Sequence, residues 1–385
     1  MAITEKTCFQ KILGSLCPLA KSDTGKSKDF DYNGICNHIC MVASSCGHPF
    51  VNYRDDLFLY EGTHWILLDK YELKSFLKEA FAIVEDDVES SSIRKVLENM
   101  IVQFPYNCIT SHIQQADNTI NFKNGELNFS GDSAALTKHN PKHFFRYVLP
   151  YEYNSAAQAP MFHKYLDRVV PDNATQCILA EYIAWALQPN LKLEKAAFLY
   201  GSGCNGKSVF TEIVEALLGR ENVSNQALSD MCGESGDRSR AELAGKLLNI
   251  CSDVSPNANS GDVFKRLASG EPITAKLLYK DAVVIKQYAK MLFCLNELPK
   301  TKDLSNGYFR RFLIIPFNIQ IPQEEIDPKL SQKIIASELP GVMNWVLEGR
   351  KRLIAQNSFS QSDLCDQALE NYRTSMIGNK PKTTN

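Results

Sequence analysis

Residues 197–210 read AFLYGSGCNGKSVF, a short apolar run followed directly by a glycine-rich turn. The turn has the spacing G-x-x-x-x-G-K-[ST], carried by Gly201, Gly206, Lys207 and Ser208. With this spacing, backbone N–H groups curl around a phosphate chain, the lysine reaches the terminal phosphates and the serine hydroxyl can ligate Mg²⁺. The stretch therefore predicts a nucleotide-binding loop behind a buried strand. A plain strand–turn–helix is the alternative.

The residues after the loop, VFTEIVEALLG, have apolar side chains at helical spacing. The loop is therefore expected to open a helix whose positive N-terminal end faces the bound anion. Every residue of the turn is a candidate contact for the nucleotide: Gly201, Ser202, Gly203, Cys204, Asn205, Gly206, Lys207, Ser208 and Val209.

The composition limits the possible partners. The chain has 385 residues, of which 44% are hydrophobic and 22% charged, which is typical of a globular protein of two or three domains. Its net charge is −2, so no overall positive field attracts nucleic acid. Any DNA-binding surface must be a local patch, such as the lining of a channel.

The twelve cysteines are scattered, mostly through apolar runs, which predicts free thiols in a reducing compartment. One cluster suggests zinc: Cys36, His38, Cys40, Cys46 and His48. Because its spacing matches no common closed zinc site, we favour buried thiols there. No apolar run reaches 18 residues and no signal peptide is evident, so a cytoplasmic protein without a membrane partner is expected.

The pattern before the loop predicts hairpins and helices. Hairpins are expected at 57–69 and 119–131, and helices near 8–16, 70–84, 92–102, 161–170 and 175–188, with an extended linker at 141–160. From the loop onward, strands and helices alternate. The strands Ala197–Tyr200, Lys246–Ser252, Lys290–Leu295 and Phe312–Phe317 are apolar throughout, as in a parallel sheet buried on both faces. Residues beyond 327 read as helices that end in a disordered tail.

Two polar residues end predicted strands. Asp253 follows KLLNICS, where an acid that handles Mg²⁺ and water belongs, although it could instead cap a turn. Asn296 follows KMLFCL, and its amide could hydrogen-bond both a γ-phosphate and the attacking water. Arg310 and Arg311 precede the last strand, where an arginine could act in its own site or reach a neighbour's. A solvated strand start is the alternative.

The segment ITAKLLYKDAVVIK, residues 273–286, predicts a hairpin whose turn carries basic and aromatic side chains. Its candidate contacts with DNA are Lys276, Tyr279 and Lys280. An ordinary surface hairpin is the alternative.

The order of these segments resembles the superfamily III helicases, in the branch of phage and plasmid primase–helicases and poxvirus-type primase–helicases. The motifs are FLYGSGCNGKS, LLNICSD, FKRLASGEPITAKLLYKD, MLFCLNELPK and GYFRRFLIIPF. LFLYEGTHWILLD, TINFKNGELNF, HFFRYVLPYEYN and ELPGVMNWVLEGRKRL extend the resemblance to roughly residues 57–375.

The resemblance implies an α/β fold with an AAA+ P-loop NTPase core, built on a central parallel sheet and assembled as a hexameric ring around DNA. It assigns ATP and Mg²⁺ to Lys207 and Ser208, the Walker B acid and metal ligand to Asp253, and sensor 1 to Asn296. It assigns the finger that enters the adjacent subunit's site to Arg311, with Arg310 beside it. Many relatives have two acids or a glutamate at Walker B, whereas this chain has Ser252-Asp253. Glu242 is therefore a candidate second acid.

The resemblance also implies a division of the chain. We expect an N-terminal segment at 1–55, an α+β helicase-associated domain at 56–190, the AAA+ core at 191–322 and C-terminal helices at 323–385. No acidic pair with a basic partner stands out in residues 1–195. A primase or polymerase domain is therefore expected on a separate protein or in a longer chain.

These observations predict an ATP-dependent helicase or translocase for replication of a phage, plasmid or other mobile element. Its expected partners are single-stranded DNA, forked duplex DNA and further copies of itself. The main alternative is a ring NTPase that loads or remodels replication proteins without processive unwinding. A small-molecule kinase and a DNA-binding module with a vestigial nucleotide site are weaker alternatives.

Overall fold

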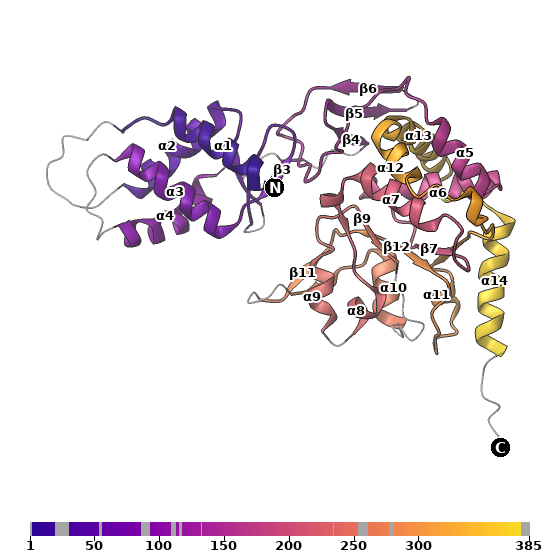
Figure 1. The fold of residues 1–385 in the computed structure, drawn as a ribbon. Coiled ribbons are helices and arrows are strands. Elements are labelled where there is room, and N and C mark those ends of the chain that lie inside the picture. The colour runs from indigo at the N-terminus through magenta and orange to yellow at the C-terminus, as the bar shows by residue number, and fades with distance from the viewer. Residues whose placement is uncertain are drawn as a thin grey trace, which may run out of the picture. The chain divides into compact units, whose positions relative to one another are not determined.

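The computed structural model describes residues 2–19, 31–53, 56–85, 93–108, 113–114, 118–131, 133–233, 235–252, 261–276 and 281–378 (Figure 1). The chain forms two compact units. Unit 1 comprises residues 1–121, 125–128 and 135–148, and unit 2 comprises 122–124, 129–134 and 149–385.

Four helices form the core of unit 1. They are α1 (Ala2–Ser15), α2 (Tyr32–Ser45), α3 (Lys70–Val84) and α4 (Ile93–Asn107). Their apolar faces meet around stacked and edge-on rings, in which Phe76 contacts Phe9 and Phe50, and Phe50 contacts Phe104. Helix α3 begins where Asp69 accepts hydrogen bonds from the first backbone N–H groups. The helices predicted near 8–16, 70–84 and 92–102 correspond to α1, α3 and α4.

An antiparallel sheet, ordered β1-β2-β3, contributes apolar side chains to this core. Its strands are β1 (Phe50–Tyr53), β2 (Asp56–Tyr60) and β3 (Trp65–Leu67). The β2–β3 pair is the hairpin predicted at 57–69, which is confirmed. One face carries a small aromatic cluster in which Phe144 contacts Phe58 and Trp65.

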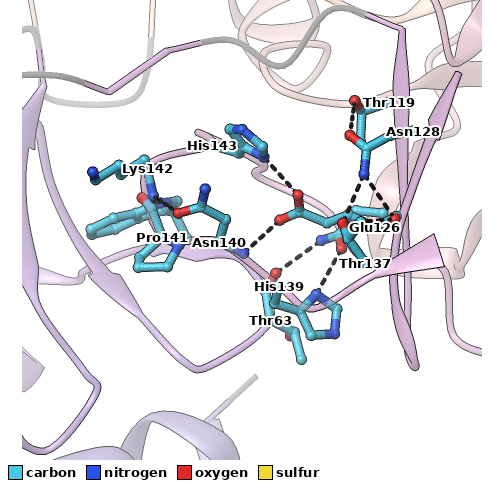
Figure 2. A network of polar contacts seen from close by, with 12 residues as sticks. Thr63, Thr119, Glu126, Asn128, Thr137, His139, Asn140, Pro141, Lys142 and His143 are labelled. Atoms are coloured by element: carbon cyan, nitrogen blue, oxygen red, sulfur yellow. Dashed lines mark hydrogen bonds and ion pairs between the residues drawn. The ribbon is translucent and has the colours of Figure 1, made fainter. Parts of the chain in front are cut away.

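A second antiparallel sheet contains β4 (Thr119–Phe122), β5 (Gly125–Ser130) and β6 (Ser133–Thr137) in that order. Figure 2 shows the polar network beside it. The carboxylate of Glu126, only 1% exposed, accepts hydrogen bonds from the backbone N–H of Asn140 at 2.8 Å and pairs with Nδ1 of His143 at 2.6 Å. Asn121 donates to the backbone oxygens of Thr63 and Tyr147. These hydrogen bonds hold the segment after β6 in place, although that segment forms no helix or strand of its own.

Unit 2 is built on a five-stranded parallel sheet in the order β13-β7-β12-β9-β8. The strands are β7 (Ala196–Tyr200), β8 (Val223–Ser224), β9 (Leu248–Cys251), β12 (Lys290–Leu295) and β13 (Phe312–Pro316). The expectation of an α/β unit around a central parallel sheet is therefore confirmed. The four predicted strands are present, and the two-residue β8 adds an edge that the sequence pattern did not indicate.

Helices cover this sheet (Figure 1). They are α5 (Pro160–Val169), α6 (Asn173–Ala186), α7 (Lys207–Leu218), α8 (Leu228–Cys232), α9 (Gly236–Ala241), α10 (Gly261–Ser269), α11 (Asn306–Phe309), α12 (Leu330–Ser337), α13 (Leu339–Gln356) and α14 (Asp363–Gly378). Short 3₁₀ turns lie at Arg220–Asn222 and Gln323–Glu325. An aromatic core joins the layers, since the ring of Phe312 contacts those of Phe198, Phe264 and Tyr372.

The predicted hairpin at 273–286 is present in its two strands, β10 (Ile273–Ala275) and β11 (Val283–Ile285), which pair antiparallel. Arg240 of helix α9 contacts the hairpin by donating to the backbone oxygen of Thr274 in β10. It also donates to the backbone oxygen of Met231 in α8. Val283 and Val284 are more than half exposed. Tyr279 and Lys280, the other predicted contacts with DNA, lie outside the described residues.

None of the helices described here combines the length and the apolar character that crossing a membrane requires.

Candidate nucleotide site

A cavity of about 1300 Å³ opens at the carboxyl edge of the parallel sheet. Its walls come from α5, the glycine-rich loop, the ends of β9 and β12, and the segment from Ile321 to Leu330. In open parallel sheets this edge is where ligands bind. The loop residues from Gly203 to Val209 all line the cavity, so the structure brings most of the predicted contacts together.

Two glycines of the loop are required by space and conformation. A Cβ on Gly201 would lie 2.2 Å from Asn205 Nδ2 and 2.3 Å from the backbone oxygen of Phe317. Gly206 has φ +84°, and a Cβ there would lie 2.8 Å from Val169 Cγ1. Neither position accepts a larger residue without displacing its surroundings. The loop therefore keeps a bare backbone directly before α7, as a phosphate cradle needs.

Lys207 is folded back over this loop. Its Nζ donates to the backbone oxygen of Gly201 at 2.7 Å, to Asn205 Oδ1 at 3.0 Å and to Asn296 Oδ1 at 3.3 Å. The predicted loop lysine and the predicted sensor amide thus meet, although 89 residues separate them. Parallel pairing of β7 with β12 causes the meeting, because it sets the two strand ends side by side.

Among the residues that the structure describes, the charge of Lys207 has only neutral oxygens around it. Among the described residues it forms no ion pair, and its burial lowers the pKa of the amine, with a small opposing effect from Cys294. A buried ammonium group without a counter-ion favours an anionic ligand. The exposed hydroxyl of Ser208 lies next to it at the start of α7. These residues fit a phosphate chain, and Ser208 offers an oxygen to a divalent cation.

Helix α5 contributes residues that the sequence analysis missed. The hydroxyl of Tyr165 donates to the backbone oxygen of Gly206 at 2.7 Å, which ties the loop to α5. Arg168 and Glu325 both line the cavity, and Nη2 of Arg168 lies 3.0 Å from Oε2 of Glu325. Apolar side chains form another part of the wall, namely Met161, Val169, Ile321, Ile326 and Leu330. The sequence predicted α5 only as a helix after the linker, without any motif that marks it as part of a site.

Acidic groups at the cavity are partly described. Asp253 lies outside the described residues, but Ser252 before it lines the cavity. Glu297, which follows Asn296, is exposed and also lines the cavity, and the sequence analysis did not select it. Glu242 is exposed at the end of α9 and is absent from the described cavity lining.

The remaining predicted residues lie elsewhere. Arg310 and Arg311 precede β13 at the amino edge of the sheet, and neither is among the described residues that line the cavity. Ser202 is exposed at the loop and accepts from Gln320 at 3.2 Å. Lys276 is exposed at the end of β10, and its backbone N–H donates to the oxygen of Asp237.

Two members of the cysteine cluster, Cys36 and Cys40, belong to the apolar core of unit 1. Cys36 and Cys40 are buried on α2, and Cys40 Sγ lies 3.9 Å from Cys108 Sγ. Burial raises the pKa of the Cys36 thiol to about 12, which disfavours the thiolate that zinc requires. No group of three or more metal-ligating side chains occurs in the described part of the chain. Buried thiols, the favoured interpretation, agree with this geometry.

Comparisons with known proteins give two family matches. Residues 42–171 match the D5 N terminal like family, and residues 199–311 match a family of unknown function, DUF5906. A protein of Acanthamoeba polyphaga mimivirus named "Putative helicase L207/L206" is 31% identical over 160 residues. That match covers 40% of this chain and 16% of the viral protein, so the chain corresponds to a small part of its relative.

Solved structures share the fold. An A form apo structure of the NrS-1 C-terminal region superposes with a TM-score of 0.56 at 13% identity, covering 87% of this chain and 74% of that one. Another apo structure of the same region gives 0.56 at 13% identity, with coverages of 89% and 76%. Together with the D5 N terminal like match and the viral relative, this shared fold supports a phage-type primase–helicase family for the chain. The resemblance found in the motif order is thereby confirmed.

Proposed function

We propose that this chain is an ATP-dependent DNA helicase or translocase with an AAA+ P-loop NTPase core, which works as a ring in replication of a phage, plasmid or other mobile element. The observation that carries the proposal is the position of Lys207. Its buried amine contacts the glycine-rich loop and Asn296 and has only neutral oxygen partners among the described residues.

The cavity offers suitable contacts for both the phosphates and the base of a nucleoside triphosphate. The bare loop and the N-terminal end of α7 would bind the phosphates, with Lys207 neutralising their charge. The apolar wall, which includes Val169, Ile321 and Leu330, would take the base. A cavity of about 1300 Å³ has room for such a ligand.

Hydrolysis needs charge stabilisation at the γ-phosphate and a correctly oriented water. Lys207 supplies the positive charge, and Asn296 can hold the water or the phosphate oxygen by hydrogen bonds. Asp253 is the proposed acid, and its carboxylate and the Ser208 hydroxyl would hold Mg²⁺. When bound, Mg²⁺ would neutralise phosphate charge.

Single-stranded DNA is the proposed track, and forked duplex DNA the proposed substrate for unwinding. The β10–β11 hairpin supports this role, because it carries Lys276 on an exposed strand end and Arg240 braces its base. Several copies of such a hairpin around a central channel would form a local positive surface despite the net charge of −2. The name of the mimivirus relative supports the same class of activity.

The test measures ATP hydrolysis by the full chain with and without single-stranded DNA, followed by unwinding of a labelled fork. We expect DNA-stimulated hydrolysis and unwinding. Lys207→Ala should lower hydrolysis at least about 100-fold, because it removes a preorganised charge at the phosphates. Lys74→Ala, which removes an exposed lysine on α3, is the matched control and should hydrolyse like the wild type.

Two results would contradict the proposal in different ways. Wild-type turnover in folded Lys207→Ala protein would exclude the nucleotide site. Hydrolysis without unwinding of any fork would instead favour the loader or remodeller, which needs the nucleotide site but no tracking hairpin.

A further inference from the structure

One segment of unit 1 concentrates positive charge without nearby acids in the sequence. Residues 133–151 contain no aspartate or glutamate, although the chain as a whole has a net charge of −2. Within them, residues 138–146 read KHNPKHFFR, which supplies two lysines, one arginine and two histidines. This basic segment follows β6, belongs to unit 1 and forms no helix or strand. Its charge is a local feature that the overall composition does not indicate.

Three cations of the basic segment face solvent. Lys138, Lys142 and Arg146 are exposed, and none of them forms an ion pair with any residue that the structure describes. Each is four residues from the next, so successive Cα atoms lie at most about 14 Å apart. Three unpaired cations at this spacing form a local positive surface, which attracts an anionic polymer.

The buried acid beneath the basic segment does not neutralise these cations. Both oxygens of the Glu126 carboxylate are used inside the network, one by the backbone N–H of Asn140 at 2.8 Å and the other by Nδ1 of His143 at 2.6 Å. Figure 2 shows the side chain of Lys142 pointing away from this carboxylate. The inner side of the segment is therefore satisfied, whereas its outer side keeps its charge.

Further hydrogen bonds fix the backbone on both sides of Lys142. The N–H of Gln114 donates to the oxygen of Lys142 at 3.0 Å, and the N–H of Phe144 donates to the oxygen of Gln114 at 3.0 Å. Nε1 of Trp65 donates to the oxygen of Pro141 at 3.1 Å. An irregular segment held in this way presents its cations in a fixed arrangement, so binding a ligand costs less conformational entropy.

Aromatic rings lie beside the cations. The ring of Phe144 is 4.8 Å from that of Tyr53, whose side chain is 37% exposed. The guanidinium carbon of Arg146 lies 5.2 Å from the ring centroid of Phe58, with Asp56 nearby. Basic side chains that follow a backbone, together with rings on which bases stack, are the contacts that proteins use for single-stranded nucleic acid.

We infer that the basic segment of unit 1 is a second binding site for single-stranded DNA, separate from the β10–β11 hairpin. Lys138 and Lys142 contact phosphates, Tyr53 stacks on a base, and the network around Glu126 positions the segment. The inference rests on the proposed function only in the choice of DNA as the anionic polymer.

The experiment measures binding of a fluorescent oligothymidylate to the full chain across a salt series without nucleotide. Lys138→Ala/Lys142→Ala should weaken binding and reduce the slope of log affinity against log salt by about 1.4, since each lost phosphate contact contributes roughly 0.7. Both side chains are exposed, so the unfolding temperature should stay at the wild-type value. An unchanged slope in this folded variant would overturn the inference.

The matched control is Lys74→Ala/Lys78→Ala, which removes two exposed lysines at the same spacing from α3 of the same unit. It should bind like the wild type. An equal loss of slope in the control would show that any exposed lysine pair has this effect, which would also overturn the assignment to the basic segment.

Tyr53→Leu tests the preference for a single strand. Leucine keeps an apolar contact with Phe144 but loses the flat ring, so oligothymidylate binding should weaken without a change in salt slope, and duplex binding should be unaffected. Equal effects on single-stranded and duplex DNA would overturn the single-strand assignment.

Combining the lysine variants separates the two DNA sites. Adding Lys276→Ala/Lys280→Ala to Lys138→Ala/Lys142→Ala should reduce the slope by about 2.8, because independent contacts add. A combined loss no larger than that of the hairpin variant alone would contradict a second site. Lysine-dependent DNA binding by a chain that hydrolyses no ATP would defeat the proposed function and leave this inference standing, whereas unwinding with an unchanged slope in Lys138→Ala/Lys142→Ala would do the reverse.

Discussion

The two edges of the parallel sheet in unit 2 differ in the partners of their positively charged side chains. At the carboxyl edge, the partners of Lys207 in the described part of the chain are neutral oxygens at 2.7–3.3 Å. At the amino edge, Arg311 is bonded to oxygens of its own chain, Arg310 faces Glu194, and Lys290 lies 4.3 Å from the ring centroid of Trp185. The carboxyl edge therefore leaves the ammonium group of Lys207 available for an anionic ligand. The positively charged side chains of the amino edge instead contact groups of their own chain.

This difference separates two kinds of recognition. A buried cation without a counter-ion suits a small anionic ligand that enters a cavity. Cations with weak, exposed partners suit a macromolecule that displaces those partners on docking. The β10–β11 hairpin also enters the sheet at the amino edge, because β11 leads into the start of β12. This difference supports the proposed nucleotide site at the carboxyl edge and leaves the amino edge, where the hairpin enters the sheet, for the proposed contact with DNA.

The largest effect expected at the carboxyl edge concerns the acid that supports hydrolysis. Asp253→Asn should still bind nucleotide but hydrolyse it at least about 100-fold more slowly, because the amide keeps the shape and loses the charge. Glu297→Gln, at the exposed acid that lines the cavity, should change the rate less than about tenfold. Single-turnover hydrolysis of both variants decides the point. The reverse order would assign the essential acid to Glu297.

At the amino edge the two arginines should differ in stability. Arg311→Ala removes a buried guanidinium group and its hydrogen bonds to three oxygens, so it should cost about 2–4 kcal/mol. Arg310→Ala removes one exposed ion pair and should cost less than about 1 kcal/mol. Urea unfolding of the two variants gives this comparison directly. Equal costs would contradict the difference in burial and bonding between the two arginines.

Sequence alone predicted most of the carboxyl edge. The glycine, lysine and serine spacing specifies a backbone geometry, and Gly201 and Gly206 occupy positions where a Cβ does not fit. The uniformly apolar strands predicted parallel pairing, which brings Asn296 to Lys207. Motif spacing and the apolar character of strands are properties of short segments, so they can be recognised in the sequence without the tertiary structure.

The amino edge and α5 could not be predicted in the same way. Arg310 and Arg311 are identical neighbours in the sequence, and only the positions of α10 and α11 decide which one is buried. Tyr165 contacts Gly206 across 41 residues of chain without any motif. Strand β6 was missed because its five residues are all exposed and lack an alternating pattern. Each failure involves a contact that the tertiary fold creates.

The hairpin should affect DNA binding more modestly. Lys276→Ala/Lys280→Ala should weaken single-stranded DNA binding and reduce the slope of log affinity against log salt by about 1.4, since each lost phosphate contact contributes roughly 0.7. ATP hydrolysis without DNA should remain near the wild-type rate, because Lys276 is absent from the described cavity lining. Lys74→Ala is the control. An unchanged salt slope would contradict the proposed contact with DNA and support the alternative, an ordinary surface hairpin.

The smallest effect is a pH dependence at the amino edge. Burial lowers the pKa of Lys290 to about 8, with a further contribution from Lys192, while the Trp185 ring partly offsets this by favouring the cation. Between pH 8 and the ordinary lysine value of 10.5, the unfolded chain binds more protons than the folded one. Stability should therefore rise with pH across that window, and the cost of burying the cation is fully present below it. Lys290→Met has no such titration, so its free energy of unfolding relative to the wild type should change across the window and stay constant outside it. Other groups titrate equally in both proteins and cancel in this difference. A constant difference at every pH would mean that the pKa of Lys290 is the same in the folded and the unfolded chain, so that burial does not shift it.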